Sequence, residues 1–282
     1  MTLHKMLDGS TDSTRNIFGE LEVPSNAKLD LVARLKESDR RYARFVELER
    51  AYTISLPTKI EYRDRPKTGM REYFVAEHRA LPHDVRTAAN GVISELRNVL
   101  DNTVYQLALH SNGGAKPNTK IYFPISSNQE NYDNWKNKSL KPLPREIIRC
   151  VDQIEPYKGG KGHRLWQLNT LSRIDKHHQL IGASARNSGV SINHKLYELV
   201  PGLNKMKDKI PRINLNPAYK GPVEVGSVLY SEPISDNDEF VEFDFFVSFM
   251  ADEFDSSDPA GLVLGEIKYK VWETIDVLMG FL

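Results

Sequence analysis

The sequence has one cysteine and no long apolar run, and each scarcity excludes a class of protein. Cys150 has no partner for an internal disulfide, and its place in the apolar run 147–151 predicts a small core residue rather than a reactive thiol. No stretch approaches the roughly 18 apolar residues of a membrane span. The polar start, residues 1–19, lacks the apolar centre of a secretion signal. We therefore expect a cytoplasmic protein that does not enter a membrane.

The chain also lacks an excess of either charge and lacks several motifs that carry chemistry. Lys plus Arg and Asp plus Glu number 38 each, so no long-range positive field indicates nucleic acid, although a local basic patch is compatible with a balanced total. Residues 158–162, Lys-Gly-Gly-Lys-Gly, do not have P-loop spacing and are typical of a connector. Metal-ligand spacings of His and Cys and the serine-hydrolase elbow are missing. We expect no metal and no cofactor.

What the chain does have is enough apolar sequence for a large core. With 40% hydrophobic residues in 282, it can form one large domain or two closely packed ones. Residues 1–24 are polar and predict a flexible arm. We expect residues 25–282 to form a single α+β domain. Its parts are a helical core at about 83–185, a mostly antiparallel β-rich part at about 190–250, and a C-terminal helix at about 259–282.

Apolar residues at helical spacing predict the individual helices. Two long helices are expected, from Ser25 and Asn26 to near Tyr52 and from Pro82 to about His110. The first carries mixed charges, which indicate an ion-paired, solvated face rather than a nucleic-acid stripe. Further helices are expected at 144–154 and from 163 to about Ala185.

Other segments predict strands and loops. Residues 60–62 and 73–75 flank a Pro- and Gly-containing turn and predict a β-hairpin, and 223–230 and 240–249 are typical of antiparallel strands. Residues 111–142 are polar and predict a long excursion over the surface.

The segment 165–181 is the most informative, because it places charged residues in a helix with apolar side chains on two sides. These are Arg173, Asp175, Lys176, His177 and His178. On a continuous helix, Asp175 and His178 share one face, and Arg173 and His177 share the opposite face.

The earlier long helix carries Arg97 and Asp101 one turn apart, and they would meet Asp175 and His178 if the two helices pack. One interpretation is structural: buried charges need partners, and such pairs fix the helix register. The other is functional: a carboxylate, a histidine and an arginine in a cleft supply a general base and a phosphate clamp.

Two resemblances involve these residues. The first is carried by residues 96–102, Phe123-Pro124-Ile125, residues 154–157 and the run from Leu165 to His177. Over roughly residues 85 to 185 this pattern resembles a family of uncharacterised bacterial proteins, which implies no activity.

The second resemblance is carried by Arg173 and His178, separated by four residues. This spacing resembles the Arg-to-His signature of HEPN-superfamily ribonucleases, which are helical proteins common in toxin and antiphage systems. The resemblance implies a homodimer, an RNA substrate and cleavage by the RNA 2′-hydroxyl without a metal. Arg173 would hold the phosphate and His178 would transfer a proton.

The histidine assignment stays open between two residues. Residues five apart lie about 140° apart on a regular helix, so Arg173 shares its face with His177 rather than His178. Asp175, Lys176, Arg97 and Asp101 are candidate supporting residues. The competing hypothesis is a non-catalytic binding or regulatory module in which these charges only organise the core.

Overall fold

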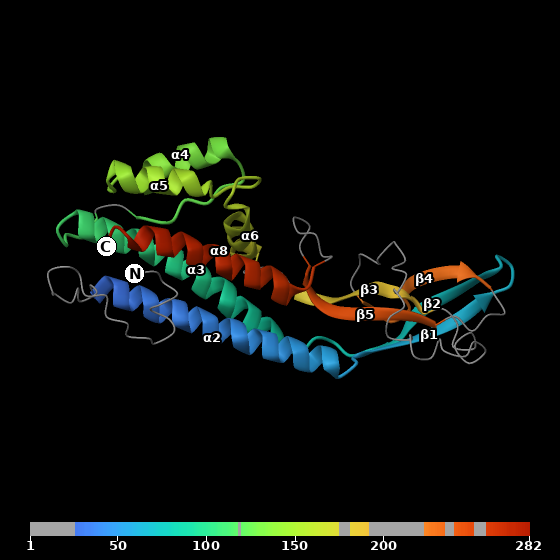
Figure 1. Ribbon diagram of the computed structural model, residues 1–282. Helices are drawn as coiled ribbons and strands as arrows, with labels where there is room; N and C mark the ends of the chain where they lie inside the picture. Colours follow the sequence, from blue (N-terminus) through green and yellow to red (C-terminus); the bar gives the residue numbers. More distant parts are fainter. Residues whose placement is uncertain (1–25, 118–119, 175–180, 192–222, 235–239, 251–257) are drawn as a thin grey trace, which may run out of the picture. The chain divides into compact units, whose positions relative to one another are not determined.

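The computed structural model describes residues 26–117, 120–174, 181–191, 223–234, 240–250 and 258–282 (Figure 1). The helices of this part are α2 (Asn26–Ile54), α3 (His83–Ser111), α4 (Gln129–Ser139), α5 (Arg145–Ile154), α6 (His163–Ile174) and α8 (Ala260–Met279). The strands are β1 (Thr58–Arg65), β2 (Met70–His78), β3 (Ile181–Ser191), β4 (Val228–Pro233) and β5 (Phe240–Phe249). Every pairing between these strands is antiparallel, which confirms the expected α+β class.

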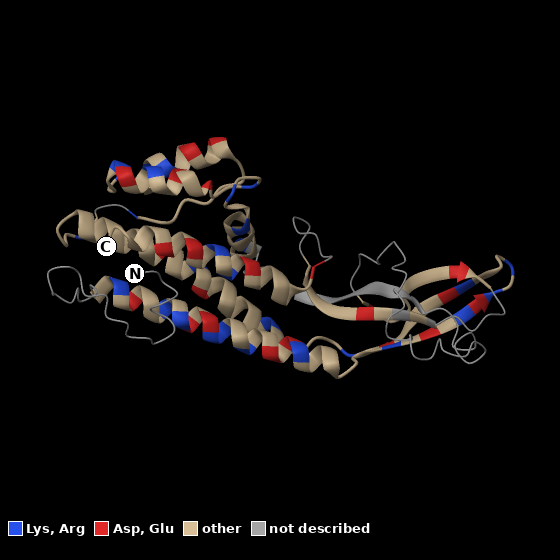
Figure 2. Ribbon diagram, viewed as in Figure 1, with Lys and Arg blue, Asp and Glu red and all other residues tan. Residues whose placement is uncertain are grey.

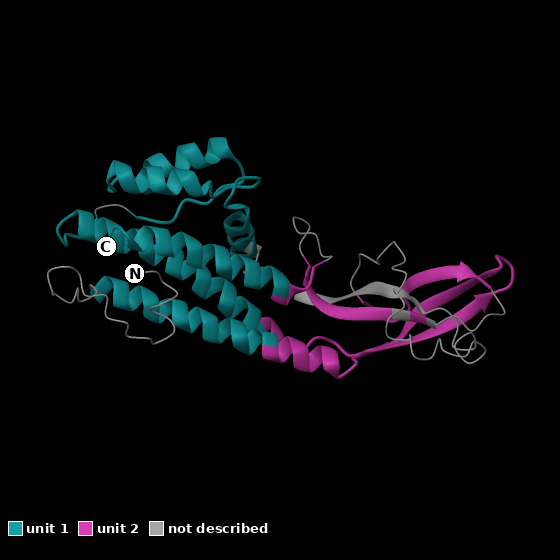
Figure 3. Ribbon diagram, in the orientation of Figure 1, with its two compact units in different colours: residues 1–46, 87–178, 262–282 teal, residues 47–86, 179–261 magenta. Residues whose placement is uncertain are grey.

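The chain divides into two compact units (Figure 3). One unit comprises Met1–Val46, Thr87–His178 and Leu262–Leu282, and the other comprises Glu47–Arg86 and Gln179–Gly261. Compactness alone does not decide whether the units fold separately, so the single domain expected from residue 25 to 282 stays a prediction. The arm expected over residues 1–24 lies outside the described residues.

The first unit is built on apolar stripes of long helices. Helix α3 buries a residue on nearly every turn, and α8 does the same, in the i, i+3, i+4 pattern of a core-facing helix. The fully buried side chains on these two helices include Val92, Ile93, Leu96, Val99, Leu100, Val104, Leu107, Leu264, Ile267, Val271, Ile275 and Leu278. The predicted helices at 25–52, 82–110 and 259–282 are confirmed to within a few residues.

The charged face of α2 carries ion pairs, as its mixed sequence predicted. Figure 2 shows basic and acidic residues interleaved along the helix. Arg34 contacts Asp30 at 3.1 Å and Arg41 contacts Glu37 at 3.0 Å, and all four side chains are more than 40% exposed. Such exposed pairs contribute little to stability and do not form a continuous basic surface.

The second unit contains two sheets, one with the order β1-β2-β4 and one pairing β3 with β5. The predicted hairpin is confirmed: β1 and β2 are joined by a turn that ends at Gly69, whose φ of 66° suits glycine. Tyr62, Tyr73 and Tyr230 lie opposite one another across the three strands, with ring centroids 6.1 and 6.0 Å apart. These cross-strand aromatic pairs stabilise the register.

Residues 111–142 differ from the surface excursion that we expected. They include helix α4, and Phe123 and Leu140 are 1% and 0% exposed. Helix α4 was missed because its sequence is almost wholly polar; Asn128 begins it, with its side chain accepting the Asn131 N–H at 2.8 Å. A polar stretch therefore packs against the helical core.

Cys150 lies half-buried on α5, and burial raises the pKa of its thiol, which disfavours the reactive thiolate. None of the helices in the described ranges combines the length and apolar character that crossing a bilayer requires.

A carboxylate sits at the start of α8. The N–H of Gly261 donates to Glu49 Oε1 at 3.3 Å, and burial raises the pKa of Glu49 to about 6 even though this hydrogen bond acts in the opposite direction. A Cβ atom at position 261 would overlap the Glu49 carboxylate, so only glycine allows this approach. The charged form of Glu49 is therefore less stable in the folded protein than in the unfolded chain.

This raised pKa predicts a pH-dependent stability. Because folding raises the pKa of Glu49, the charged carboxylate destabilises the folded protein fully when the pH is above the folded-state pKa of about 6. The destabilisation disappears when the pH falls below the unfolded-state pKa of 4.5. Glu49→Gln keeps an acceptor for Gly261 and removes the charge, so it should raise the free energy of unfolding by about 1 to 2 kcal/mol at pH 8. At pH 5 the gain in the free energy of unfolding should be less than half of the gain at pH 8, as measured by urea unfolding. The exposed Glu224→Gln control should change neither value, and equal gains at both pH values would refute the interpretation.

Candidate functional site

The site begins with a buried ion pair within α3. Arg97 Nη2 lies 2.9 Å from Asp101 Oδ1, one helical turn away, and the side chains are only 16% and 24% exposed. Burial lowers the pKa of Arg97 and raises the pKa of Asp101, and the opposite charge partly offsets each shift. Charges removed from water in this way need each other and further hydrogen bonds.

The further hydrogen bonds go to the backbone of one residue, Phe123. Arg97 Nη2 donates to the Phe123 carbonyl at 3.0 Å, and the Phe123 N–H donates to Asp101 Oδ1 at 2.9 Å. Phe123 belongs to no strand and is 1% exposed, so the ion pair satisfies backbone groups that a sheet would otherwise satisfy. We call this arrangement the Phe123 clamp. It brings together two parts of the family-like pattern, residues 96–102 and 123–125.

Neighbouring residues of the same extended segment are held in similar ways. The Tyr122 N–H donates to Ser139 Oγ at 3.0 Å, and the Ser139 hydroxyl donates to the Tyr122 carbonyl. The Ser126 N–H donates to the Pro156 carbonyl at 3.1 Å, and its carbonyl accepts from the Lys158 N–H at 3.3 Å. Side chains of α3 and α4 and the loop before α6 therefore fix residues 122–126.

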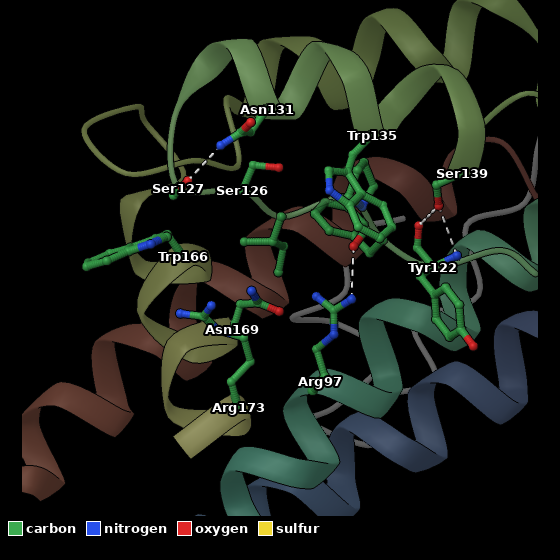
Figure 4. Close-up of a pocket in the computed structure, with 13 residues that line it drawn as sticks. Arg97, Tyr122, Ser126, Ser127, Asn131, Trp135, Ser139, Trp166, Asn169 and Arg173 are labelled. Atoms are coloured by element: carbon green, nitrogen blue, oxygen red, sulfur yellow. Dashed lines mark hydrogen bonds between the residues drawn. The ribbon is translucent and has the colours of Figure 1, made fainter. Parts of the chain in front are cut away.

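The fixed segment forms one wall of a pocket of about 500 Å³ (Figure 4). Helix α3 contributes Arg97 and α6 contributes Trp166, Asn169 and Arg173, while α4 contributes Trp135. The complete lining is Arg97, Tyr122, Phe123, Pro124, Ile125, Ser126, Ser127, Asn131, Trp135, Ser139, Trp166, Asn169 and Arg173. Both charged residues in this lining are arginines, so the pocket suits an anionic group.

Two buried polar atoms of the lining have no hydrogen-bond partner among the described residues. They are Arg97 Nη1 and Ser126 Oγ. Each is a donor, and an unsatisfied buried donor costs about 1 to 3 kcal/mol. A ligand oxygen in the pocket would remove that cost.

The structure brings some of the predicted site residues together. Arg97 and Arg173 both line the pocket, and Arg173 is an exposed residue in the last turn of α6. Asp101 pairs with Arg97 on the same helix. Asp175, Lys176, His177 and His178 lie outside the described residues, so their predicted roles stay predictions.

The expectation of a helix continuing to Ala185 is wrong. Helix α6 ends at Ile174, and β3 begins at Ile181, which pairs with Phe249 of β5. Residues 182–185 are Gly, Ala, Ser and Ala, and this pattern of small side chains does not distinguish a helix from a strand. The strand forms because these residues pair with the aromatic strand β5. The assignment of Arg173 with His177 and of Asp175 with His178 to two faces concerns residues 175–178, which lie outside the described residues, and it stays a prediction.

Several pocket residues were not foreseen from the sequence. Four of them lie in the stretch 111–142, whose polar sequence predicts a surface excursion: Ser126, Ser127, Asn131 and Trp135. Asn169 is a single polar residue between the buried Leu168 and Thr170, and no motif marks it. One signal was present: Trp135 is a large aromatic side chain in a run of polar residues, where no core requires it.

The glycine-rich loop at 158–162 directs donors of Lys161 and Gly162 to Glu155. Lys161 contacts the Glu155 carboxylate through both its N–H, at 3.1 Å, and its Nζ, at 2.8 Å, and the Gly162 N–H donates to the Glu155 carbonyl. These donors, which a phosphate loop would present to a ligand, are already used. The loop is a connector, as its spacing indicated.

The Phe123 clamp predicts a large, non-additive effect on stability. Asp101→Ala leaves the buried Arg97 cation and the Phe123 N–H unpaired and should lower the free energy of unfolding by about 3 to 5 kcal/mol in urea titrations. The double variant Arg97→Met, Asp101→Leu should lose less than the sum of the two single changes. Asp30 and Arg34 form a matched but exposed pair on α2, and Asp30→Ala should cost less than about 1 kcal/mol. Equal losses for Asp101→Ala and Asp30→Ala would refute the clamp.

Comparison of the chain with protein-family models, with curated proteins and with solved structures finds no match. The two resemblances noted in the sequence are therefore neither supported nor opposed by a relative.

Proposed function

We propose that the protein binds RNA in this pocket and cleaves it as a metal-independent, HEPN-like endoribonuclease. The observation that carries the proposal is the position of Arg173. The residue expected to hold a phosphate lines an open pocket together with Arg97, Asn169 and two tryptophans. Arginine donors beside aromatic rings suit a ligand that combines phosphate with planar bases.

The proposed reaction is a transfer of the phosphoryl group within the RNA. The 2′-hydroxyl oxygen attacks the adjacent phosphorus, and the bond from phosphorus to the 5′-oxygen of the next nucleotide breaks. The products are a 2′,3′-cyclic phosphate and a 5′-hydroxyl, and the proton lost by the nucleophile is balanced by the one that the leaving oxygen gains. Arg173 stabilises the charge on the phosphate oxygens, and His177 or His178 transfers a proton.

The two arginines have different roles in this proposal. Arg97 Nη2 is already bound to Asp101 and to the Phe123 carbonyl, so its first role is to hold the pocket wall. Arg173 comes from the end of α6 and is exposed, which suits a group that contacts a large substrate. The catalytic assignment therefore lies with Arg173 and a histidine, and Arg97 and Asp101 are positioning residues.

The alternative function is a binding or regulatory module that does not cleave. The Phe123 clamp favours this alternative, because the hydrogen bonds to Phe123 explain the buried charges of Arg97 and Asp101 without catalysis. Both functions are consistent with a cytoplasmic protein. The nuclease proposal further includes a homodimer, in which two copies of the Arg173 segment meet.

The test is cleavage of RNA in the presence of a chelator. Wild type should produce 2′,3′-cyclic phosphate ends, and RNA with 2′-deoxy substitutions should be resistant. Arg173→Ala should lower kcat/KM by about 100-fold or more, as loss of an oxyanion donor does in other enzymes. His177→Ala and His178→Ala identify which histidine acts. The matched control is Arg149→Ala, an exposed arginine of α5 outside the pocket, which should retain full activity.

Unfolding is followed for every variant, so that lost stability is not taken for lost catalysis. RNA binding without cleavage by wild type would select the non-catalytic module. If both histidine variants cleave like wild type, the HEPN-like assignment is wrong. Light scattering of the purified protein measures the subunit number, and a monomer would contradict the dimeric part of the proposal.

A further inference from the structure

The unpartnered donors of the pocket show where an anion would bind. Arg97 Nη1 and Ser126 Oγ are fully buried in the lining, and Ser126 is 6% exposed. The backbone of Ser126 is fixed by hydrogen bonds to Pro156 and from Lys158, and its hydroxyl oxygen is buried at this position. Buried donors that no described residue satisfies, in a pocket lined by arginines, suit the oxygens of a phosphate.

The aromatic side chains of the pocket differ in exposure. Trp166 is 4% exposed, with Lys158 Nζ 4.7 Å from its ring centroid and the His163 ring 5.1 Å away. Trp135 is 58% exposed, and Figure 4 shows its indole lying over the Arg97 side of the pocket. Trp166 is thus a buried wall, whereas Trp135 presents a free ring surface beside the anion-binding donors. An exposed indole is a stacking platform for a planar group.

From these two features we propose that the pocket is a binding site for one nucleotide with an unpaired base. The phosphate accepts hydrogen bonds from Arg97 Nη1, Ser126 Oγ and Arg173, and the base stacks on Trp135. A volume of about 500 Å³ lies in the range of small-ligand pockets. Bases within a duplex are already stacked on their neighbours, so the site selects single-stranded segments. This inference takes its substrate class from the proposed function, but it does not require cleavage.

The inference is tested with ligands that contain no internucleotide bond. Calorimetric titration of the full-length protein compares adenosine 5′-monophosphate, adenosine and inorganic phosphate. We expect the monophosphate to bind at least tenfold more tightly than either fragment. If the monophosphate and inorganic phosphate bind equally tightly, the base makes no contact and the proposed site is refuted. If the monophosphate and adenosine bind equally tightly, the phosphate makes no contact and the site is likewise refuted.

Substitutions separate the two halves of the site. Trp135→Leu should weaken monophosphate binding by on the order of tenfold to a hundredfold and leave phosphate binding unchanged, since stacking contributes that much per base. Trp135→Phe retains a ring and should recover most of the affinity. Ser126→Ala should weaken the monophosphate and phosphate alike. Tyr269 on α8 is 72% exposed and lies outside this pocket, so Tyr269→Leu is the matched control and should bind normally.

The outcomes distinguish this inference from the nuclease proposal. Monophosphate binding without RNA cleavage supports the nucleotide site and refutes the nuclease. RNA cleavage with unchanged monophosphate binding in Trp135→Leu and Ser126→Ala refutes the nucleotide site alone. Thermal unfolding of each variant shows whether a loss of binding reflects a loss of folded protein.

Discussion

The pocket depends on one interaction, the ion pair between Arg97 and Asp101 and its hold on the backbone of Phe123. An extended segment outside any sheet has N–H and C=O groups that must be satisfied before it can be buried. In this protein two charged side chains on one face of α3 satisfy both groups of Phe123. The charges in turn need these hydrogen bonds, because a bare ion pair in a poorly solvated site does not recover the cost of its desolvation.

Within Arg97, this mutual dependence involves one terminal nitrogen and not the other. Arg97 uses one terminal nitrogen for Asp101 and Phe123, and its other terminal nitrogen is buried in the pocket lining. The Arg97 side chain therefore both holds Phe123 in the pocket wall and lines the pocket. Arg173, from α6, completes a cationic lining with Trp135 at one side. The contacts of Arg97 Nη2 with Asp101 and Phe123 meet the structural hypothesis for these charges, and Arg97 Nη1 remains for the ligand that we propose.

The sequence predicts this arrangement only in part, and the reasons are physical. The helices α2, α3 and α8 follow from apolar periodicity, since burying one face of a long helix leaves a strong repeat. Arg97, Asp101 and Arg173 draw attention because charges interrupt apolar helices. Helix α4 carries Trp135 in a polar sequence with little repeat, and β3 begins where small residues fit helix and strand equally well. Phe123 lies 26 residues after Arg97 and 22 residues after Asp101 in the sequence, and no local pattern encodes contacts over such separations.

The hold of the ion pair on Phe123 can be measured by amide hydrogen exchange, followed by nuclear magnetic resonance in wild type and in Asp101→Ala. The wild-type Phe123 amide should exchange as slowly as the buried helical amides of α3, because its N–H is bound to Asp101 Oδ1. In the variant its protection should fall by a much larger factor than that of the α3 amides, which report the global loss of stability. A Phe123 amide that exchanges freely in wild type, or whose protection falls only by the same factor as that of the α3 amides, would show that Asp101 does not hold this segment.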